Sequence, residues 1–167
     1  GNVVGKHRKV HLFDIDIKGR MTFKESDSLS AGNSITTVST PWGLVGLGIC
    51  YDLRFPELAA AMREKGCKML FYPGAFNMVT GPLHWELLQR ARAVDNQLFV
   101  VSCSPARVKA PNGYVAYGRS NVISPMGAVL GDAGADDNVM VVEIDLDQVE
   151  EMRQNIPTSK QKRFDLY

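Results

Sequence analysis

The sequence predicts an α/β fold built on a mixed β-sheet. Between residues 42 and 103, three short apolar runs alternate with two segments of helical character. Apolar runs of this length are typical of buried parallel strands, and the helices between them are typical of the connections in a layered α/β domain. The flanking strand-like segments are joined by turns instead of helices, so we expect a sheet of mixed direction.

The first strand and helix of this region have clear ends. An apolar run at residues 44–49 is closed by Cys50, and a polar turn follows it. Pro56 then opens a segment that ends before Gly66. Proline is favoured in the first helical turn and glycine just past the last, so residues 56–65 are predicted to be a helix.

The alternation then repeats. A second apolar run at residues 69–72 stops at Pro73, a helix begins at Pro82, and residues 98–103 form the third strand. The apolar positions of this second helix have helical spacing: Leu83, Leu87, Ala91 and Val94.

The flanks contain shorter elements. Residues 14–25 alternate polar and apolar positions around a turn at residues 18–19, which predicts a hairpin able to cover a pocket, although plain surface hairpins are commoner. Residues 160–167 show no periodicity. Further strands are expected at residues 10–13, 35–39, 120–123 and 139–144, turns at 125–127 and 131–134, and a helix at 145–153.

Composition excludes several classes of protein. The 167 residues suffice for one domain, and 45% of them are hydrophobic. A net charge of +1 and the lack of a long apolar run argue against binding to nucleic acid or membrane. Three cysteines without a CxxC pair argue against a disulfide framework or zinc site, so we expect a reducing, cytoplasmic location. No motif implies a nucleotide, another cofactor or a metal.

Cys50 is the candidate nucleophile. It lies where a strand turns sharply into a helical segment, a position that exposes a side chain and aims backbone N–H groups at a developing oxyanion. The alternative is that Cys50 only fills the end of a strand, because free cysteine behaves as a small hydrophobe. Cys67 and Cys103 are interpreted as packing residues.

The Cys50 thiol needs a neighbour to ionise, because an unassisted thiol has a pKa of about 8.5. The sequence spacing does not place His11 or His84 near it, and we interpret the histidines as structural. Lys9 leads directly into an apolar segment, and its ammonium group could favour the thiolate and bind an oxyanion. The alternative for Lys9 is a solvated surface charge.

Six motifs along the chain carry a family resemblance: RKVHLFD at residues 8–14, FKESD at 23–27, GICYDLRFPE at 48–57, YPGAF at 72–76, HWELLQRARA at 84–93 and GRS at 118–120. Together they resemble the carbon–nitrogen hydrolase (nitrilase) superfamily, and most of all its omega-amidase branch. The resemblance covers essentially the whole chain. It implies a four-layer α-β-β-α sandwich with mixed sheets.

The resemblance also assigns catalytic roles. It makes Cys50 the nucleophile, Lys9 the lysine of a Glu–Lys–Cys triad, and Glu25 a further glutamate that holds the lysine and the substrate amide. The backbone N–H of Tyr51 joins Lys9 in the oxyanion hole. The implied reaction releases ammonia from the terminal amide of an α-keto acid monoamide, such as alpha-ketoglutaramate or alpha-ketosuccinamate, through a thioester.

The far end of such a substrate is a carboxylate, for which arginine is a suitable partner. Arg54 is close enough to Cys50 in sequence to border the same pocket, and the alternative is a salt bridge to Asp52 or Glu57 that anchors the turn. The expected pocket wall is the loop before the second helix, with Phe76, Met78 and Thr80.

One family feature has no counterpart in these residues. The general-base glutamate precedes the lysine motif in the family, but only eight residues precede Lys9 here. We therefore expect residues 1–167 to be an incomplete carbon–nitrogen hydrolase domain that associates with itself as a homodimer or with a separate N-terminal segment supplying the glutamate. Two alternatives stay open: a non-catalytic module that acts by chain pairing, and another carbon–nitrogen hydrolase such as an N-carbamoyl amidase or a nitrilase.

Overall fold

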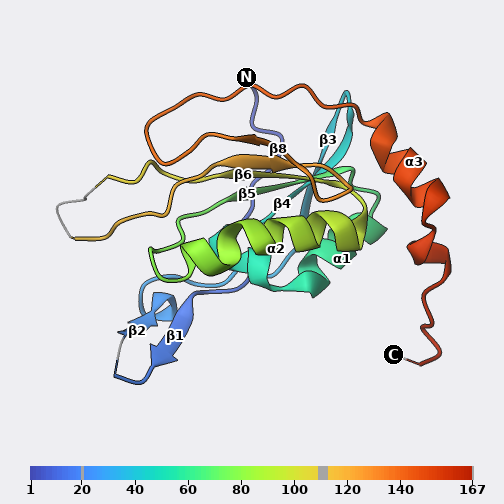
Figure 1. Ribbon diagram of the computed structural model, residues 1–167. Helices are drawn as coiled ribbons and strands as arrows, with labels where there is room; N and C mark the ends of the chain where they lie inside the picture. The colour runs from blue at the N-terminus through green and yellow to red at the C-terminus, as the bar shows by residue number, and fades with distance from the viewer. Residues whose placement is uncertain (20, 109–112, 167) are drawn as a thin grey trace.

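The computed structural model describes residues 1–19, 21–108 and 113–166. A six-stranded sheet in the order β3-β4-β5-β6-β7-β8 forms its centre, and a separate hairpin of β1 and β2 projects from one end (Figure 1). The elements in chain order are β1 (Asp14–Ile17), β2 (Met21–Lys24), η1 (Glu25–Asp27), β3 (Thr36–Thr40), β4 (Gly43–Leu47), η2 (Cys50–Arg54), α1 (Pro56–Glu64), β5 (Met69–Pro73), α2 (Gly81–Asn96), β6 (Phe99–Cys103), β7 (Asn121–Ile123), β8 (Val129–Asp132), α3 (Asp147–Asn155) and η3 (Thr158–Lys160).

The sheet is mixed, as the sequence predicts. β4, β5 and β6 are parallel neighbours, and α1 and α2 are the connections between them. β3 pairs antiparallel with β4 at one edge, and β7 and β8 continue antiparallel from β6 at the other. The parallel centre brings the carboxyl ends of β4 and β5 to one edge of the sheet, which is where α/β proteins place their binding sites.

The two faces of the sheet are covered differently. α1 and α2 lie on one face (Figure 1), where they pack on alternate strand residues such as Leu70 and Val100. The intervening residues Met69 and Phe99 point to the opposite face and contact Val149 of α3. That second face also carries an apolar groove over β3, β4 and β5, with Trp42 68% exposed beside it.

The predicted helix at residues 56–65 is confirmed as α1. Pro56 occupies its first turn, where the missing N–H costs nothing, and Gly66 follows with φ of +96°, a conformation that suits glycine. The short polar turn before α1 is a 3-10 helix, η2, which begins at Cys50. In the described residues, no helix is both long and apolar enough to cross a bilayer.

The second predicted helix is present as α2, but its apolar row faces outward. Leu83 and Leu87 are 63% and 61% exposed, and the buried face carries Trp85 and Ala93 together with the polar residues Gln89, Arg92 and Asn96. The donors of these polar side chains reach main-chain oxygens: Arg92 Nε donates to the Leu53 carbonyl, and Asn96 Nδ2 donates to that of Arg92. The buried face therefore combines apolar packing with hydrogen bonds, and it is not the face that the apolar spacing predicts.

Three predictions on the flanks are wrong. Residues 10–13 form no strand, because their N–H groups bond to side chains: His11 N donates to Asp52 and Phe13 N to Glu25. Residues 139–144 form no strand either, and Val139 and Val141 are exposed. The turn expected at residues 131–134 is displaced, because Gly131 and Asp132 belong to β8 and the chain bends at residues 135–137.

Candidate active site

Cys50 sits on a strained turn between β4 and α1. Its φ of 48° is in the left-handed region, which is rare for a residue with a side chain. The end of β5 presses closely on this turn, since a Cβ placed on Gly74 would lie 2.9 Å from the Cys50 Cα. Glycine at position 74 therefore permits the approach that holds Cys50 at the carboxyl end of β4.

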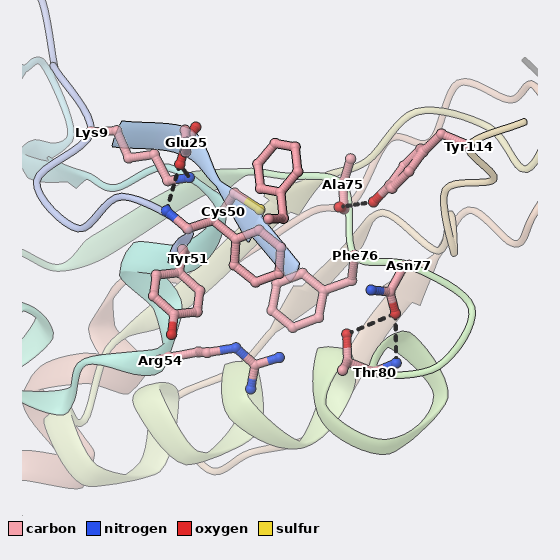
Figure 2. A pocket seen from close by; sticks show the side chains of 12 residues that line it. Lys9, Glu25, Cys50, Tyr51, Arg54, Ala75, Phe76, Asn77, Thr80 and Tyr114 are labelled. Carbon is pink, nitrogen blue, oxygen red and sulfur yellow. Dashed lines mark hydrogen bonds and ion pairs between the residues drawn. The ribbon is translucent and has the colours of Figure 1, made fainter. Parts of the chain in front are cut away.

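Cys50 opens into a cavity of about 300 Å³ (Figure 2). The wall comes from the β1–β2 hairpin, the η2 turn, the loop after β5 and the loop that carries Tyr114. Its lining residues are Lys9, Phe13, Phe23, Glu25, Cys50, Tyr51, Arg54, Ala75, Phe76, Asn77, Thr80 and Tyr114. The expected site residues Lys9, Glu25, Cys50 and Arg54 thus meet in one place.

Lys9 and Glu25 form an ion pair inside this cavity. The Lys9 Nζ donates to Glu25 Oε2, and the side chains are only 11% and 18% exposed. The same carboxylate oxygen accepts the Phe13 N–H at 2.6 Å. Glu25 follows β2 directly, so the hairpin returns the carboxylate to the segment that bears Lys9. The sequence-based alternative of a solvated Lys9 is wrong.

Arg54 lies at the opposite side of the cavity from this pair (Figure 2). Its guanidinium lies 4.8 Å from the Phe76 ring centroid, and its Nη1 is 3.2 Å from His84 Nδ1. The expected alternative, a salt bridge to Asp52 or Glu57, is not formed in the described part of the chain. Burial lowers the pKa of Arg54, but the group stays cationic and lacks a carboxylate partner there.

The loop after β5 forms the wall only in part. Phe76 and Thr80 line the cavity, whereas Met78 does not and is exposed. The reason is a tight turn: Asn77 Oδ1 accepts the N–H groups of Val79 and Thr80, which leaves Met78 on the outside. The prediction that Met78 lines the pocket is therefore wrong.

Several residues that line the cavity were not predicted from the sequence. Phe23 reaches the cavity from the hairpin, whose alternating sequence pattern could have indicated it, and Phe13 reaches the cavity from the residue just before β1. Tyr114 comes from a loop far along the chain, and its hydroxyl donates to the Ala75 carbonyl at 2.6 Å. Nothing in the local sequence around Tyr114 indicates this contact.

Two histidines meet on one buried carboxylate beside the cavity. Asp52 is fully buried, and its Oδ1 accepts both the backbone N–H and the Nδ1 of His11 at 2.9 Å. Its Oδ2 accepts the Ile49 N–H at 2.9 Å and His7 Nε2 at 3.2 Å. Burial alone would raise the pKa of Asp52, but these hydrogen bonds outweigh it and hold the pKa below its usual value.

The cysteines differ sharply in environment. Cys67 is buried as expected, and burial raises the pKa of its thiol to about 11. Cys103, interpreted from sequence as a packing residue, is exposed at the end of β6, so that interpretation is wrong. All three thiols are free.

The chain is similar in sequence to proteins of one known family. The model of the carbon-nitrogen hydrolase family matches residues 1–154. This chain is a carbon-nitrogen hydrolase family member. It is 56% identical to the omega-amidase NIT2 of Mus musculus over all 167 residues, which is 60% of that protein's length, and 54% identical to the human omega-amidase NIT2 over the same share. The chain thus spans about 60% of the curated relatives it matches.

A solved structure of the same family confirms the predicted fold class. Nit3 of Saccharomyces cerevisiae, a member of branch 10 of the nitrilase superfamily, is 48% identical with a TM-score of 0.86, over 98% of this chain and 56% of that one. The mixed sheet with α1 and α2 on one face fits the α-β-β-α sandwich of this carbon-nitrogen hydrolase family.

Proposed function

We propose that this carbon-nitrogen hydrolase cleaves the terminal amide of α-keto acid monoamides, such as alpha-ketoglutaramate and alpha-ketosuccinamate. The products are the dicarboxylic acid and ammonia. One observation carries the proposal. Cys50, on a strained turn, lines the same small cavity as the mostly buried ion pair of Lys9 and Glu25 and the half-buried Arg54. The omega-amidase name of the mouse and human relatives supports the same choice.

The first half of the reaction acylates Cys50. The Lys9 ammonium favours the thiolate, and the sulfur adds to the amide carbonyl, forming a C–S bond. The carbonyl electrons move to oxygen, where Lys9 and the Tyr51 backbone N–H stabilise the negative charge. The C–N bond then breaks, and the leaving nitrogen takes up the proton that the Cys50 thiol released on ionisation and departs as ammonia.

The second half hydrolyses the thioester and needs a base for water. Among the described residues that line the cavity, Glu25 is the only carboxylate, and Lys9 and Phe13 already bind it. Our proposal therefore includes a second glutamate from a separate segment, which removes a proton from water as the water oxygen forms a bond to the thioester carbon. The C–S bond then breaks, the acid is released, and the Cys50 sulfur takes the proton back from the glutamate. It also includes a homodimer and a reducing, cytoplasmic location in which Cys50 stays a thiol.

Selective alkylation tests the proposed nucleophile. With iodoacetamide at pH 7, Cys50 is expected to react at least about tenfold faster than exposed Cys103, because a neighbouring ammonium raises its thiolate fraction. Cys67 is expected to stay unmodified while folded, because it is buried with a thiol pKa of about 11. Peptide mass spectrometry gives each rate, and a Cys103→Ser variant isolates Cys50. A Cys50 no faster than Cys103 would favour the non-catalytic module.

Arg54 is proposed to bind the distal carboxylate of the substrate. Arg54→Ala is expected to raise KM for a keto-acid amide about 10- to 100-fold, since a charge-assisted hydrogen bond contributes about 1.5–3 kcal/mol. KM for an uncharged amide of the same length should change little. Steady-state ammonia release measures both, and Arg90→Ala on the outer side of α2 is the matched control. Equal effects on the two amides would remove Arg54 from substrate recognition.

A further inference from the structure

The carboxylate of Asp52 connects the two segments that carry the proposed nucleophile and its lysine. From the turn around Cys50 it accepts the Ile49 N–H, one residue before the cysteine. From the segment around Lys9 it accepts three donors, two on His11 and one on His7. One buried group thus connects the segment that carries Cys50 to the segment that carries Lys9.

The histidines and the lysine of this segment make different contacts. His7 and His11 lie two residues before and two residues after Lys9, so in an extended strand all three side chains would point to the same side. This segment is not a strand, and its side chains diverge. The histidines reach Asp52, whereas Lys9 reaches Glu25 and the cavity.

The segment depends on these contacts for its place. Residues 1–13 form no helix or strand, and the main chain of Lys9 is held by a single hydrogen bond among those of the described residues, from the Gly32 N–H to the Lys9 carbonyl at 2.8 Å. Beyond Asp52, the His7 Nδ1 bonds the Thr36 hydroxyl at 3.0 Å, and the His11 ring stacks on Phe55 at 3.6 Å. A four-donor, fully buried carboxylate is the strongest of these anchors, because a partner removed from it leaves buried polar groups unsatisfied.

We propose that Asp52 is a positioning residue, which acts through His7 and His11 to hold the Lys9 ammonium against Cys50. This inference rests on the proposed function. Asp52 is not among the residues that line the cavity. Its effect on the thiolate passes through Lys9.

The charge of Asp52 makes the proposal distinguishable from a direct electrostatic effect. A carboxylate two residues from Cys50 disfavours the thiolate, so removal of its charge alone would make Cys50 more reactive. Displacement of Lys9 would make Cys50 less reactive. The two explanations therefore predict opposite signs for Asp52→Asn.

A double-mutant cycle on Cys50 alkylation tests the proposal. All variants carry Cys103→Ser, and the rate with iodoacetamide is measured from pH 6 to 10. Asp52→Asn is expected to slow Cys50 at least about fivefold at pH 7 and to shift its profile to higher pH. In a Lys9→Met background, the same substitution is expected to change the rate less than twofold. A faster Cys50, or an equal slowing in both backgrounds, would overturn the proposal.

Conservative variants separate positioning from folding. His11→Asn keeps a donor where Nδ1 lies and should retain most of the reactivity, whereas His11→Leu should reproduce the loss seen with Asp52→Asn. If Asp52→Asn does not fold, the cycle is run with His11→Leu instead. Asp145→Asn, which removes an exposed carboxylate beside α3, is the matched control and should leave Cys50 unchanged. Hydrolysis plays no part in this readout, so failure to cleave ω-amides would count against the proposed function alone.

Discussion

Replacing Lys9 with methionine is expected to lower kcat for an ω-amide about 10²- to 10³-fold, close to the loss of one oxyanion donor. Methionine keeps the unbranched stem and removes the ammonium. The pair with Glu25 is mostly buried, so among the partners that the described residues supply, the change leaves that carboxylate with only the Phe13 N–H. KM should change much less than kcat, because the lysine acts on charge that develops during the reaction.

The Lys9 measurement needs a background rate and a control. Ammonia release by the full protein with Cys50→Ala gives the background rate, because that variant lacks the nucleophile. Lys24→Met removes an exposed ammonium from the same hairpin and should keep kcat within about twofold, as expected for a solvated surface charge. Turnover by Lys9→Met near the unmodified rate would remove Lys9 from the mechanism.

Trp85→Ala is expected to reduce the free energy of unfolding by about 3–5 kcal/mol, the usual range for a buried tryptophan. The Trp85 ring is 1% exposed and packs on Phe76 with centroids 4.9 Å apart. Its indole N–H donates to the Arg119 carbonyl at 2.7 Å, so truncation also leaves that oxygen without this partner. Because Phe76 lines the cavity, the loss should loosen the pocket wall as well.

The second tryptophan is a matched control for this change. Trp42 is 68% exposed at the turn between β3 and β4, and Trp42→Ala should reduce stability by less than about 1 kcal/mol. Chemical denaturation monitored by circular dichroism gives both values. Similar losses at the two positions would show that burial of Trp85 is not what stabilises α2.

The features that local sequence predicted are those that local rules control. Pro56 and Gly66 mark the ends of α1 because they act on their own backbone, and the apolar runs of β4, β5 and β6 are buried between layers. The turn at Cys50 was predictable for the same reason, since a strand ends there and a helical segment begins.

The features it missed depend on contacts between distant residues. Residues 10–13 look like a strand, but His11 bonds to Asp52, 41 residues away. The buried side of α2 includes polar residues beside Trp85 because their amide and guanidinium groups reach main-chain oxygens, and hydrophobic spacing cannot predict these contacts. The Tyr114 contact with Ala75 spans 39 residues and has no sequence signature.

The left-handed backbone at Cys50 bears on how this position can evolve. Glycine or asparagine adopts such a φ at lower cost than cysteine does. Selection for thermal stability alone would therefore favour replacement of Cys50, whereas selection for its chemical reactivity would retain it. In relatives that no longer need a nucleophile at this position, we expect early replacement of Cys50 by glycine or asparagine.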